Sequence, residues 1–166
     1  VGKRIVEIEI ARRSPGVRLI IVKNKKILLT KEYRPELNEY DYRLPGGKVF
    51  DTLKEYKSAI SKKIDVTKAA VKAAKQECLE ETGLIAKKLR HFVTANAGLT
   101  VIWDLFYFIV EDFEESHEGQ KLSDGELIYP EWKTFDEVKN LCLKDQKKEY
   151  RSVGIVMAYL MENKYI

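Results

Sequence analysis

The chain has 166 residues, of which 45% are apolar and 34% charged, with a formal net charge of +4. This length and balance predict one folded domain over residues 1–166 with a sizeable core. They exclude a membrane-spanning chain, because no apolar run approaches the roughly 20 residues that cross a bilayer. Val1 to Arg4 lack the apolar core of a secretion signal. Only Cys78 and Cys142 carry thiols, both in apolar patterns, so we expect reduced, buried cysteines in a cytoplasmic protein.

The first part of the chain predicts strands. Residues 4–10 alternate between apolar and charged side chains, which indicates an amphipathic strand. A Ser-Pro-Gly turn at 14–16 is followed by apolar runs at 17–22 and 26–30. Three polar residues separate the two runs, so they predict a hairpin. A polar loop then leads to the glycine pair Gly46-Gly47.

Two helices are predicted in the middle of the chain. Apolar residues recur at helical spacing over 53–64, which favours a short amphipathic helix. Asp65 and Thr67 are both good N-cap residues for a longer helix that runs to about Thr82. Gly83 follows as the expected residue just past its end.

The last part of the chain mixes strands and helices. Apolar patterns predict strands over residues 89–95, 103–110 and 127–132, with a polar loop over 111–125. Thr134 and Glu137 form a capping box that opens a helix to about Leu143. A final helix is expected over 151–163.

Three carboxylates share one face of the long predicted helix. Glu77 and Glu81 are four residues apart, and Glu80 is three from Glu77. Like charges this close repel one another. Such a cluster is typical of a site for a hard divalent cation, which binds oxygen ligands. The alternative is a solvated acidic face, since glutamate is common on exposed helices.

The residues around this cluster resemble the Nudix box, G-x5-E-x7-R-E-U-x-E-E-x-G-U, where U is a large aliphatic residue. Gly47 matches the first glycine, and the second half is matched by Glu77, Glu80, Glu81, Gly83 and Leu84. The order of the flanking elements, with Glu32-Tyr33-Arg34 and Leu44-Pro45-Gly46-Gly47, is most similar to the ADP-ribose pyrophosphatase branch. The resemblance implies an α/β Nudix fold, with a mixed β-sheet in an α/β/α sandwich.

The chain departs from the motif in its first half. Lys68 stands at the position of the first glutamate and Gln76 at that of the arginine, two residues thought to pair in the family. Both are replaced together, so no charge is left unpaired. The stretch from Gly47 to Lys68 is about fifteen residues longer than the motif allows, which marks an insertion at about 53–67. In the family this pair is thought to brace the loop against the helix, and Glu55 within the insertion is a candidate to replace it.

The resemblance implies metal-dependent hydrolysis of a nucleoside diphosphate linked to another moiety. ADP-ribose or a related nucleotide sugar is the leading substrate, and the products are a nucleoside monophosphate and a sugar phosphate. The cofactor is Mg²⁺ or Mn²⁺, held by Glu77, Glu80, Glu81 and the carbonyl of Gly46. The resemblance also implies a catalytic role for Glu80.

Other roles follow from the same resemblance. The general base would come from a late loop, with Glu126 as the first choice and Asp124 as the second. Arg34 matches an arginine that contacts substrate phosphate, against the alternative of a surface salt bridge. Gly47 and Gly98 are expected to contact substrate. Alternative bases on the late loop are Glu115, His117 and Glu118.

Some features allow two interpretations. The segment from Asp51 to Lys75 holds seven lysines against three acidic residues, which suits a phosphate substrate or a solvated helix face. Lysines of the insertion would cover the phosphates as a lid, or lie on a structural or dimer-contact helix. Aromatic residues that would stack an adenine or pack into the core are Tyr33, Tyr40, Tyr42 and Trp103.

Two other functions stay open. One is a pyrophosphohydrolase of nucleoside triphosphates or dinucleoside polyphosphates, and the other is a non-catalytic Nudix-fold domain that senses a nucleotide. We expect neither nucleic acid nor membrane as a partner, because the basic tract lacks interleaved aromatic residues and no reader motif is present. A homodimer is common among similar hydrolases.

Overall fold

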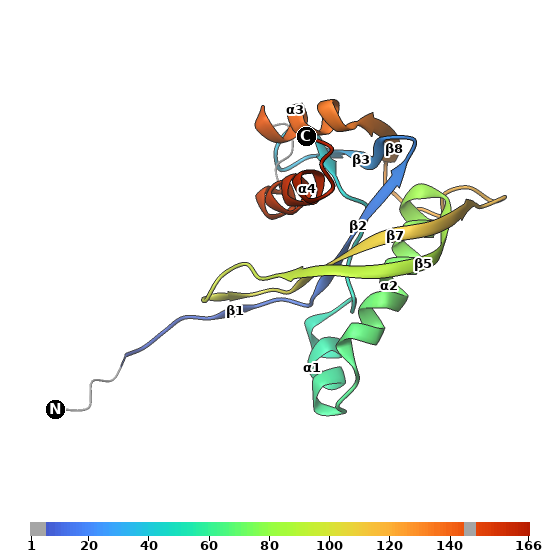
Figure 1. Cartoon of the computed structure of the whole chain (residues 1–166). Coiled ribbons are helices and arrows are strands. Elements are labelled where there is room, and N and C mark those ends of the chain that lie inside the picture. Colours follow the sequence, from blue (N-terminus) through green and yellow to red (C-terminus); the bar gives the residue numbers. More distant parts are fainter. Residues whose placement is uncertain (1–5, 145–148) are drawn as a thin grey trace.

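A mixed β-sheet lies between helices in the computed structural model, which describes residues 6–144 and 149–166 (Figure 1). The strands are β1 (Ala11–Arg12), β2 (Gly16–Lys23), β3 (Lys26–Arg34), β4 (Glu39–Arg43), β5 (Leu84–Ala95), β6 (Val101–Ile102), β7 (Leu105–Glu115) and β8 (Ile128–Thr134). The helices are α1 (Leu53–Ser61), α2 (Val66–Thr82), α3 (Phe135–Leu143) and α4 (Tyr150–Glu162). No helix within the described residues is long and apolar enough to cross a bilayer.

The sheet is organised around β2. This strand runs parallel to β7 and forms the predicted hairpin with β3. On the far side of β7 lies β5, and β3 pairs with both β4 and β8, all antiparallel. The strand order β4-β3-β2-β7-β5 therefore mixes parallel and antiparallel pairs, and the expected mixed sheet is confirmed.

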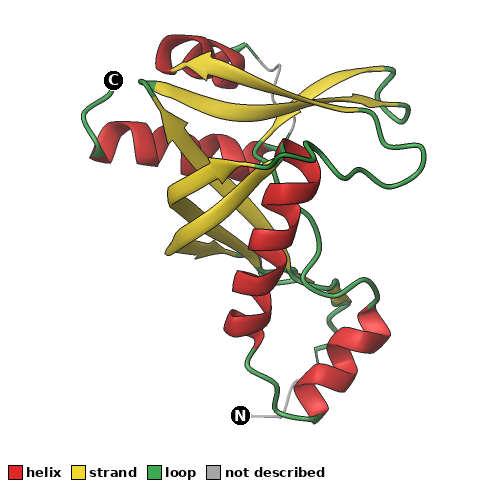
Figure 2. Ribbon diagram, turned by 90° about the vertical axis from the view of Figure 1, so that its right-hand side faces the viewer, coloured by secondary structure: helices red, strands yellow, loops and turns green. Residues whose placement is uncertain are grey.

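Both faces of the sheet are covered by helices, as the alternation along β7 requires. Leu105, Tyr107 and Ile109 belong to a buried cluster with residues of α3 and α4. Phe106 and Phe108, which point the other way, belong to a second cluster with residues of α2. Helix α2 and the C-terminal helices thus lie on opposite faces (Figure 2). The predicted α/β/α sandwich is confirmed.

Helix α2 is defined by strong signals at both ends. The side chain of Asp65 accepts hydrogen bonds from the backbone N–H groups of Thr67 and Lys68, so Asp65 is the N-cap. Gly83 ends the helix with φ of 70°, a conformation that favours glycine. Between them, Ala74 and Cys78 are fully buried, and these small side chains let the helix lie close to the sheet.

The insertion forms helix α1, as predicted. Thr52 and Glu55 make a reciprocal capping box at its start, with Thr52 Oγ1 accepting from Glu55 N at 3.1 Å. Tyr56 and Ala59 are its buried residues. Because the carboxylate of Glu55 accepts from the backbone of Thr52, its first role is to cap α1 rather than to brace α2.

The predicted strand over residues 4–10 is wrong where the structure describes it. Residues 6–10 form no strand, and the apolar side chains of Val6, Ile8 and Ile10 are exposed. Residues 4 and 5 lie outside the described residues. Strand β1 begins only at Ala11, where its N–H donates to Thr100. An alternating pattern needs a neighbouring strand, and the described chain supplies one only from Ala11 onward.

Two further strand boundaries differ from expectation. Strand β4 occupies Glu39–Arg43, within the predicted polar loop, because it is an edge strand paired with β3 and carries no apolar run. Strand β7 continues to Glu115, so the first residues of the predicted loop 111–125 are strand. Their polar side chains gave no alternating signal, but their backbone pairs with β5. Cys78 and Cys142 are both buried, as expected.

Replacing Ala74 with leucine tests the close approach of α2 to the sheet. The added side chain has no space at a fully buried position, and we expect the free energy of unfolding to fall by about 1–3 kcal/mol. Urea unfolding followed by circular dichroism would measure the change. Lys75→Leu, at the neighbouring exposed position, is the control and should change stability by no more than about 0.5 kcal/mol. Equal losses in both variants would contradict the packing.

Candidate active site

The glycine loop that precedes α1 lies directly on strand β2. Val17 N–H donates to the carbonyl of Gly47 at 2.9 Å, and Leu19 N–H donates to Pro45 at 2.8 Å. Gly46 has φ of 142°, and a side chain there would collide with the carbonyl of Val17. A side chain at Gly47 would collide with the carboxylate of Glu77. Gly46 is therefore needed to bring the loop against β2, and the absence of a side chain at Gly47 lets the carboxyl group of Glu77 lie against the loop.

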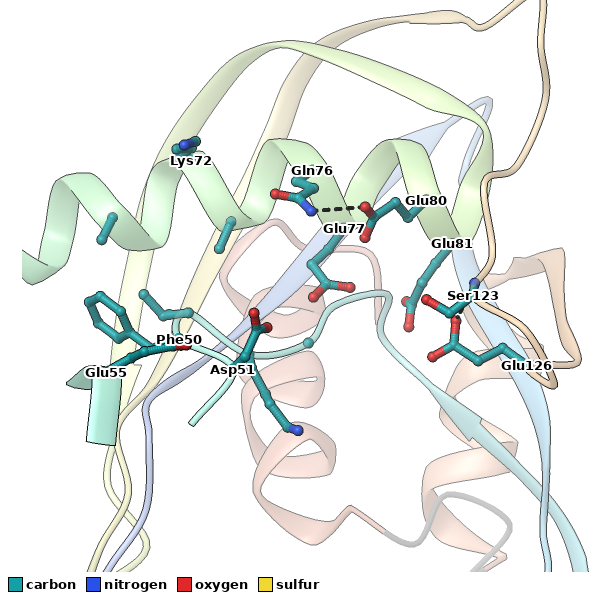
Figure 3. Close-up of a pocket in the computed structure, with 15 residues that line it drawn as sticks. Phe50, Asp51, Glu55, Lys72, Gln76, Glu77, Glu80, Glu81, Ser123 and Glu126 are labelled. Atoms are coloured by element: carbon teal, nitrogen blue, oxygen red, sulfur yellow. Dashed lines mark hydrogen bonds between the residues drawn. The ribbon is translucent and has the colours of Figure 1, made fainter. Parts of the chain in front are cut away.

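Two glutamates of α2 hold this loop. Glu81 Oε2 accepts a hydrogen bond from the backbone N–H of Gly46 at 2.7 Å. Glu77 lies against Gly47 and accepts from the backbone of Lys48. The carboxylates of Glu77 and Glu81 both point from α2 toward the loop (Figure 3). The acidic face of the helix is therefore not simply solvated.

The third glutamate of the motif has a different neighbour. Glu80 Oε1 accepts a hydrogen bond from Gln76 Nε2 at 2.9 Å, one helical turn away. Gln76 stands where the motif has arginine, so a neutral donor is fixed to this carboxylate in place of a charged one.

The pKa values of two of these carboxyl groups are raised well above the ordinary value. Burial raises the pKa of Glu81 to about 8, and the charge of Glu77 adds to this effect. Burial also raises the pKa of Glu77 to about 7, with further contributions from Glu80 and Glu126. Hydrogen bonds from Gly46 and Lys48 and the positive charge of Arg18 oppose these shifts without cancelling them. Burial therefore favours the neutral form of both carboxyl groups in the metal-free protein.

A cavity of about 710 Å³ opens between α2 and the loop. Glu77, Glu80 and Glu81 line one wall, and Glu126 lines it from the loop before β8, where Ser123 N–H donates to its carboxylate at 3.0 Å. Lysines 48 and 72 also line the cavity, whereas Lys54, Lys57, Lys62 and Lys63 of the insertion do not. The first-choice base therefore faces the acidic helix across a space large enough for a ligand (Figure 3).

A second cavity, of about 940 Å³, adjoins the first. Arg34 lines it and forms an ion pair with Glu32, with Nη2 and Oε2 2.6 Å apart. Among the described residues, no group accepts a hydrogen bond from the buried Nε of Arg34. The salt bridge that we considered as an alternative is present, yet it leaves one donor of Arg34 unused.

Other expected site residues lie elsewhere. Asp124 and Gly98 are exposed and line neither cavity, so their assigned roles stay predictions. Tyr33 packs edge-on against Tyr40, with ring centroids 5.5 Å apart, and both rings are exposed outside the cavities. Of the alternative bases, Glu115 contacts Lys23 at 3.7 Å and Glu118 contacts Lys121 at 2.5 Å, while His117 lines neither cavity.

Sequence reasoning missed a buried ion pair behind the loop. Arg18, on β2, has its guanidinium bound by both carboxylate oxygens of Glu149, at 2.9 and 3.0 Å. Its Nη1 also donates to the carbonyl of Gly46 at 3.0 Å, so one lone pair of that predicted metal ligand is occupied. Glu149 accepts in addition from Ser152 Oγ at 2.6 Å. An arginine inside the apolar run 17–22 was the available signal, because a buried charge requires a partner.

The donor set fits a divalent cation. Within residues 6–144 and 149–166, no three acidic, histidine or cysteine side chains converge closely enough to hold a metal between them. Nevertheless, Glu77, Glu80 and Glu81 supply only carboxylate oxygens, which Mg²⁺ and Mn²⁺ prefer. A bound cation would offset the burial that disfavours the ionised forms of Glu77 and Glu81.

Comparison with known proteins agrees with this geometry. The family model of the NUDIX domain matches residues 12–153, which is most of the chain. The chain therefore belongs to the NUDIX family, a family of pyrophosphohydrolases that generally use divalent metal ions. A crystal structure described as that of an ADP compounds hydrolase is similar in fold, with a TM-score of 0.66 and 15% sequence identity. The match covers 92% of this chain and 75% of that one. A search of curated proteins found no match.

Glu81→Gln should stabilise the metal-free protein at high pH. The pKa of Glu81 is about 8 in the folded protein, above its ordinary value of 4.5. The wild type therefore loses stability as the pH rises from 4.5 to about 8, whereas glutamine cannot ionise. Glutamine also keeps an acceptor for Gly46 N–H. We expect a gain on the order of 1–3 kcal/mol at pH 9, because partial access to solvent reduces the full effect, and little gain at pH 5. Thermal unfolding with a chelator at both pH values measures this, and equal gains would contradict it.

Glu149→Ala should destabilise the protein strongly. It removes both carboxylate contacts of Arg18, and an unpaired buried charge costs about 3–5 kcal/mol. Replacing both partners, as in Arg18→Met with Glu149→Leu, should recover much of this loss. Glu111→Ala breaks an exposed pair with Arg90 and is the control, with an expected loss below about 1 kcal/mol. Denaturant unfolding of the four proteins would decide, and a small loss for Glu149→Ala would refute the role of the pair.

Proposed function

We propose that the protein hydrolyses the diphosphate bond of a nucleoside diphosphate linked to another moiety. The leading substrate is ADP-ribose or a related nucleotide sugar. Water adds to one phosphorus atom, the bridging P–O bond breaks, and the products are a nucleoside monophosphate and a sugar phosphate. The observation that carries this proposal is the cavity in which Glu77, Glu80 and Glu81 face Glu126 beside the glycine loop. The fold shared with an ADP compounds hydrolase supports the substrate class.

Cationic side chains beside the carboxylates support a phosphate-containing substrate. Lys48 and Lys72 line the first cavity, and Lys48 also lines the second, where Arg34 lies. The planar guanidinium of Arg34 binds phosphate oxygens in pairs, and its unused Nε is a donor that such a ligand would engage. These groups would hold the diphosphate against the acidic helix and offset its charge.

Glu126 is proposed as the general base. Its carboxylate lies across the cavity from Glu77 and is oriented by the N–H of Ser123. From there it would accept the proton of the attacking water. Asp124 is the second choice, although its position outside both cavities favours Glu126.

The metal would be Mg²⁺ or Mn²⁺, held by Glu77, Glu80 and Glu81, with the carbonyl of Gly46 as a further ligand. Such an ion neutralises diphosphate charge and lowers the pKa of water. The residues of the chain keep these carboxylates in place: Gly46 N–H fixes Glu81, Lys48 N–H fixes Glu77, and Gln76 fixes Glu80.

The direct test is turnover against a panel of ADP-ribose, other nucleotide sugars, nucleoside triphosphates and dinucleoside polyphosphates, each with Mg²⁺ or Mn²⁺. We expect cleavage of ADP-ribose or another nucleotide sugar, loss of activity with a chelator, and a fall of about 100-fold or more in kcat for Glu81→Gln and Glu126→Gln. Phosphatase treatment converts the released phosphate monoesters to inorganic phosphate, which is then measured.

Glu118→Gln is the matched control for Glu126→Gln. Glu118 lies on the same stretch of chain, is paired with Lys121 and lines neither cavity, so its kcat should stay within about twofold of wild type. Cleavage of only triphosphates or dinucleoside polyphosphates would contradict a nucleotide sugar as the substrate and assign those compounds instead. Absence of turnover by folded protein on every compound would favour a nucleotide-sensing domain.

A further inference from the structure

The second cavity carries an arginine cluster that the diphosphate chemistry does not use. Arg12 at the end of β1, Arg13 just after it and Arg151 from α4 line it, beside Trp103. The guanidinium carbons of Arg13 and Arg151 lie 4.0 and 4.1 Å from the centroid of the Trp103 ring. Both are close enough for a cation–π contact with the indole, so Trp103 joins two guanidinium groups in one cluster.

These arginines lack carboxylate partners in the described part of the chain. Within residues 6–144 and 149–166, no acidic side chain forms a salt bridge with Arg12, Arg13 or Arg151. Arg151 Nη1 donates a hydrogen bond to the carbonyl of Trp103 at 3.1 Å. The pKa of Arg151 is lowered, first by burial, and the charges of Arg18 and Arg13 add to this effect while Tyr107 and Glu149 oppose it. Guanidinium groups without a carboxylate ion pair of their own favour an anion.

The two cavities share a wall. Residues that line both are Gly47, Lys48, Asp51, Glu81 and Glu126. A single ligand can therefore place its diphosphate beside the acidic helix and extend into the second cavity. Arg18 in that cavity is bound by Glu149, and Arg34 with Lys48 is assigned to the diphosphate, so the cluster at Trp103 is a further set of cations for the far end of such a ligand.

We propose that Arg13 and Arg151, held by Trp103, bind a phosphate monoester that the substrate carries in addition to the cleaved diphosphate. The substrate class is thus a nucleotide diphosphate with a further phosphate group. Guanidinium groups suit this ligand because each offers paired donors to phosphate oxygens. The inference rests on the proposed function, since it assigns the second end of the same substrate.

The test compares pairs of compounds that differ by one phosphate monoester. The pairs are ADP-ribose with its 2′-phosphate, ADP-ribose with its 1″-phosphate, and dephospho-coenzyme A with coenzyme A. We expect kcat/KM to favour the additional phosphate by about tenfold or more in at least one pair, through KM. Arg13→Gln and Arg151→Gln should each reduce that preference by about tenfold, while turnover of the partner without the phosphate stays within about threefold.

The control is Arg90→Gln, which removes an exposed arginine that lines neither cavity and should leave the preference unchanged. Thermal unfolding of every variant separates ligand binding from a purely structural clamp of Trp103. A clamp would lower the melting temperature and leave the preference intact, which would overturn the proposal, as would an absence of preference in all three pairs.

Failure of the proposed function is distinguishable from failure of this inference. Calorimetric titration of the same pairs into the Glu81→Gln protein compares the binding affinities of the two compounds in each pair without any cleavage. Tighter binding of the compound with the additional phosphate, lost in the Arg13→Gln background, would support the site even if nothing is hydrolysed. Equal binding within each pair, or no binding of any compound, would overturn it.

Discussion

Glu81 accepts a hydrogen bond from the backbone N–H of Gly46 at 2.7 Å, and this contact joins the acidic helix to the glycine loop. It has an electrostatic cost, because burial and the neighbouring Glu77 disfavour the ionised carboxylate. The packing of α2 on the sheet, through Ala74 and Cys78, holds the carboxylates together against their repulsion. Apolar packing therefore holds two carboxyl groups where burial disfavours their charge, and we expect a bound cation to favour their ionised forms.

The loop is held from its other side by Arg18. One guanidinium contacts the carbonyl of Gly46 and both oxygens of Glu149, so the start of α4 is coupled to the loop that faces the acidic helix. Gly46 thus donates a hydrogen bond to the carboxyl group of Glu81 through its N–H and accepts one from the guanidinium of Arg18 through its carbonyl. The positive charge of Arg18 also lowers the pKa values of Glu77 and Glu81, although it does not offset their burial. Residues far outside the motif consequently set the position and the charge of the site.

Local patterns predicted most of the fold, because the signals lie within a few residues of their effect. The hairpin of β2 and β3, the Asp65 cap and the Thr134 capping box follow from turn and cap chemistry. Strand β4 was missed because it is an edge strand without an apolar run, and residues 6–10 were overpredicted because no described strand lies beside them. Likewise, the motif pointed to the acidic cluster, and the resemblance to the ADP-ribose pyrophosphatase branch pointed to Glu126, both of which line one cavity. Neither the Arg18–Glu149 pair nor the Arg13–Trp103–Arg151 cluster has a local pattern. Both join segments more than forty residues apart in sequence.

The departures from the motif are consistent with a working acidic cluster. An arginine at position 76 would bring a permanent positive charge to α2, whereas Gln76 fixes Glu80 through a neutral amide. The amide orients the carboxylate without neutralising it, so its charge remains for a cation. Lys68 lies in the first turn of α2, where Asp65 accepts its backbone N–H, so this position contributes to the start of the helix rather than to the cavity. The insertion lengthens the segment between loop and helix, yet Gly46 and Gly47 still contact Glu81 and Glu77, since those contacts depend on β2 and α2 alone.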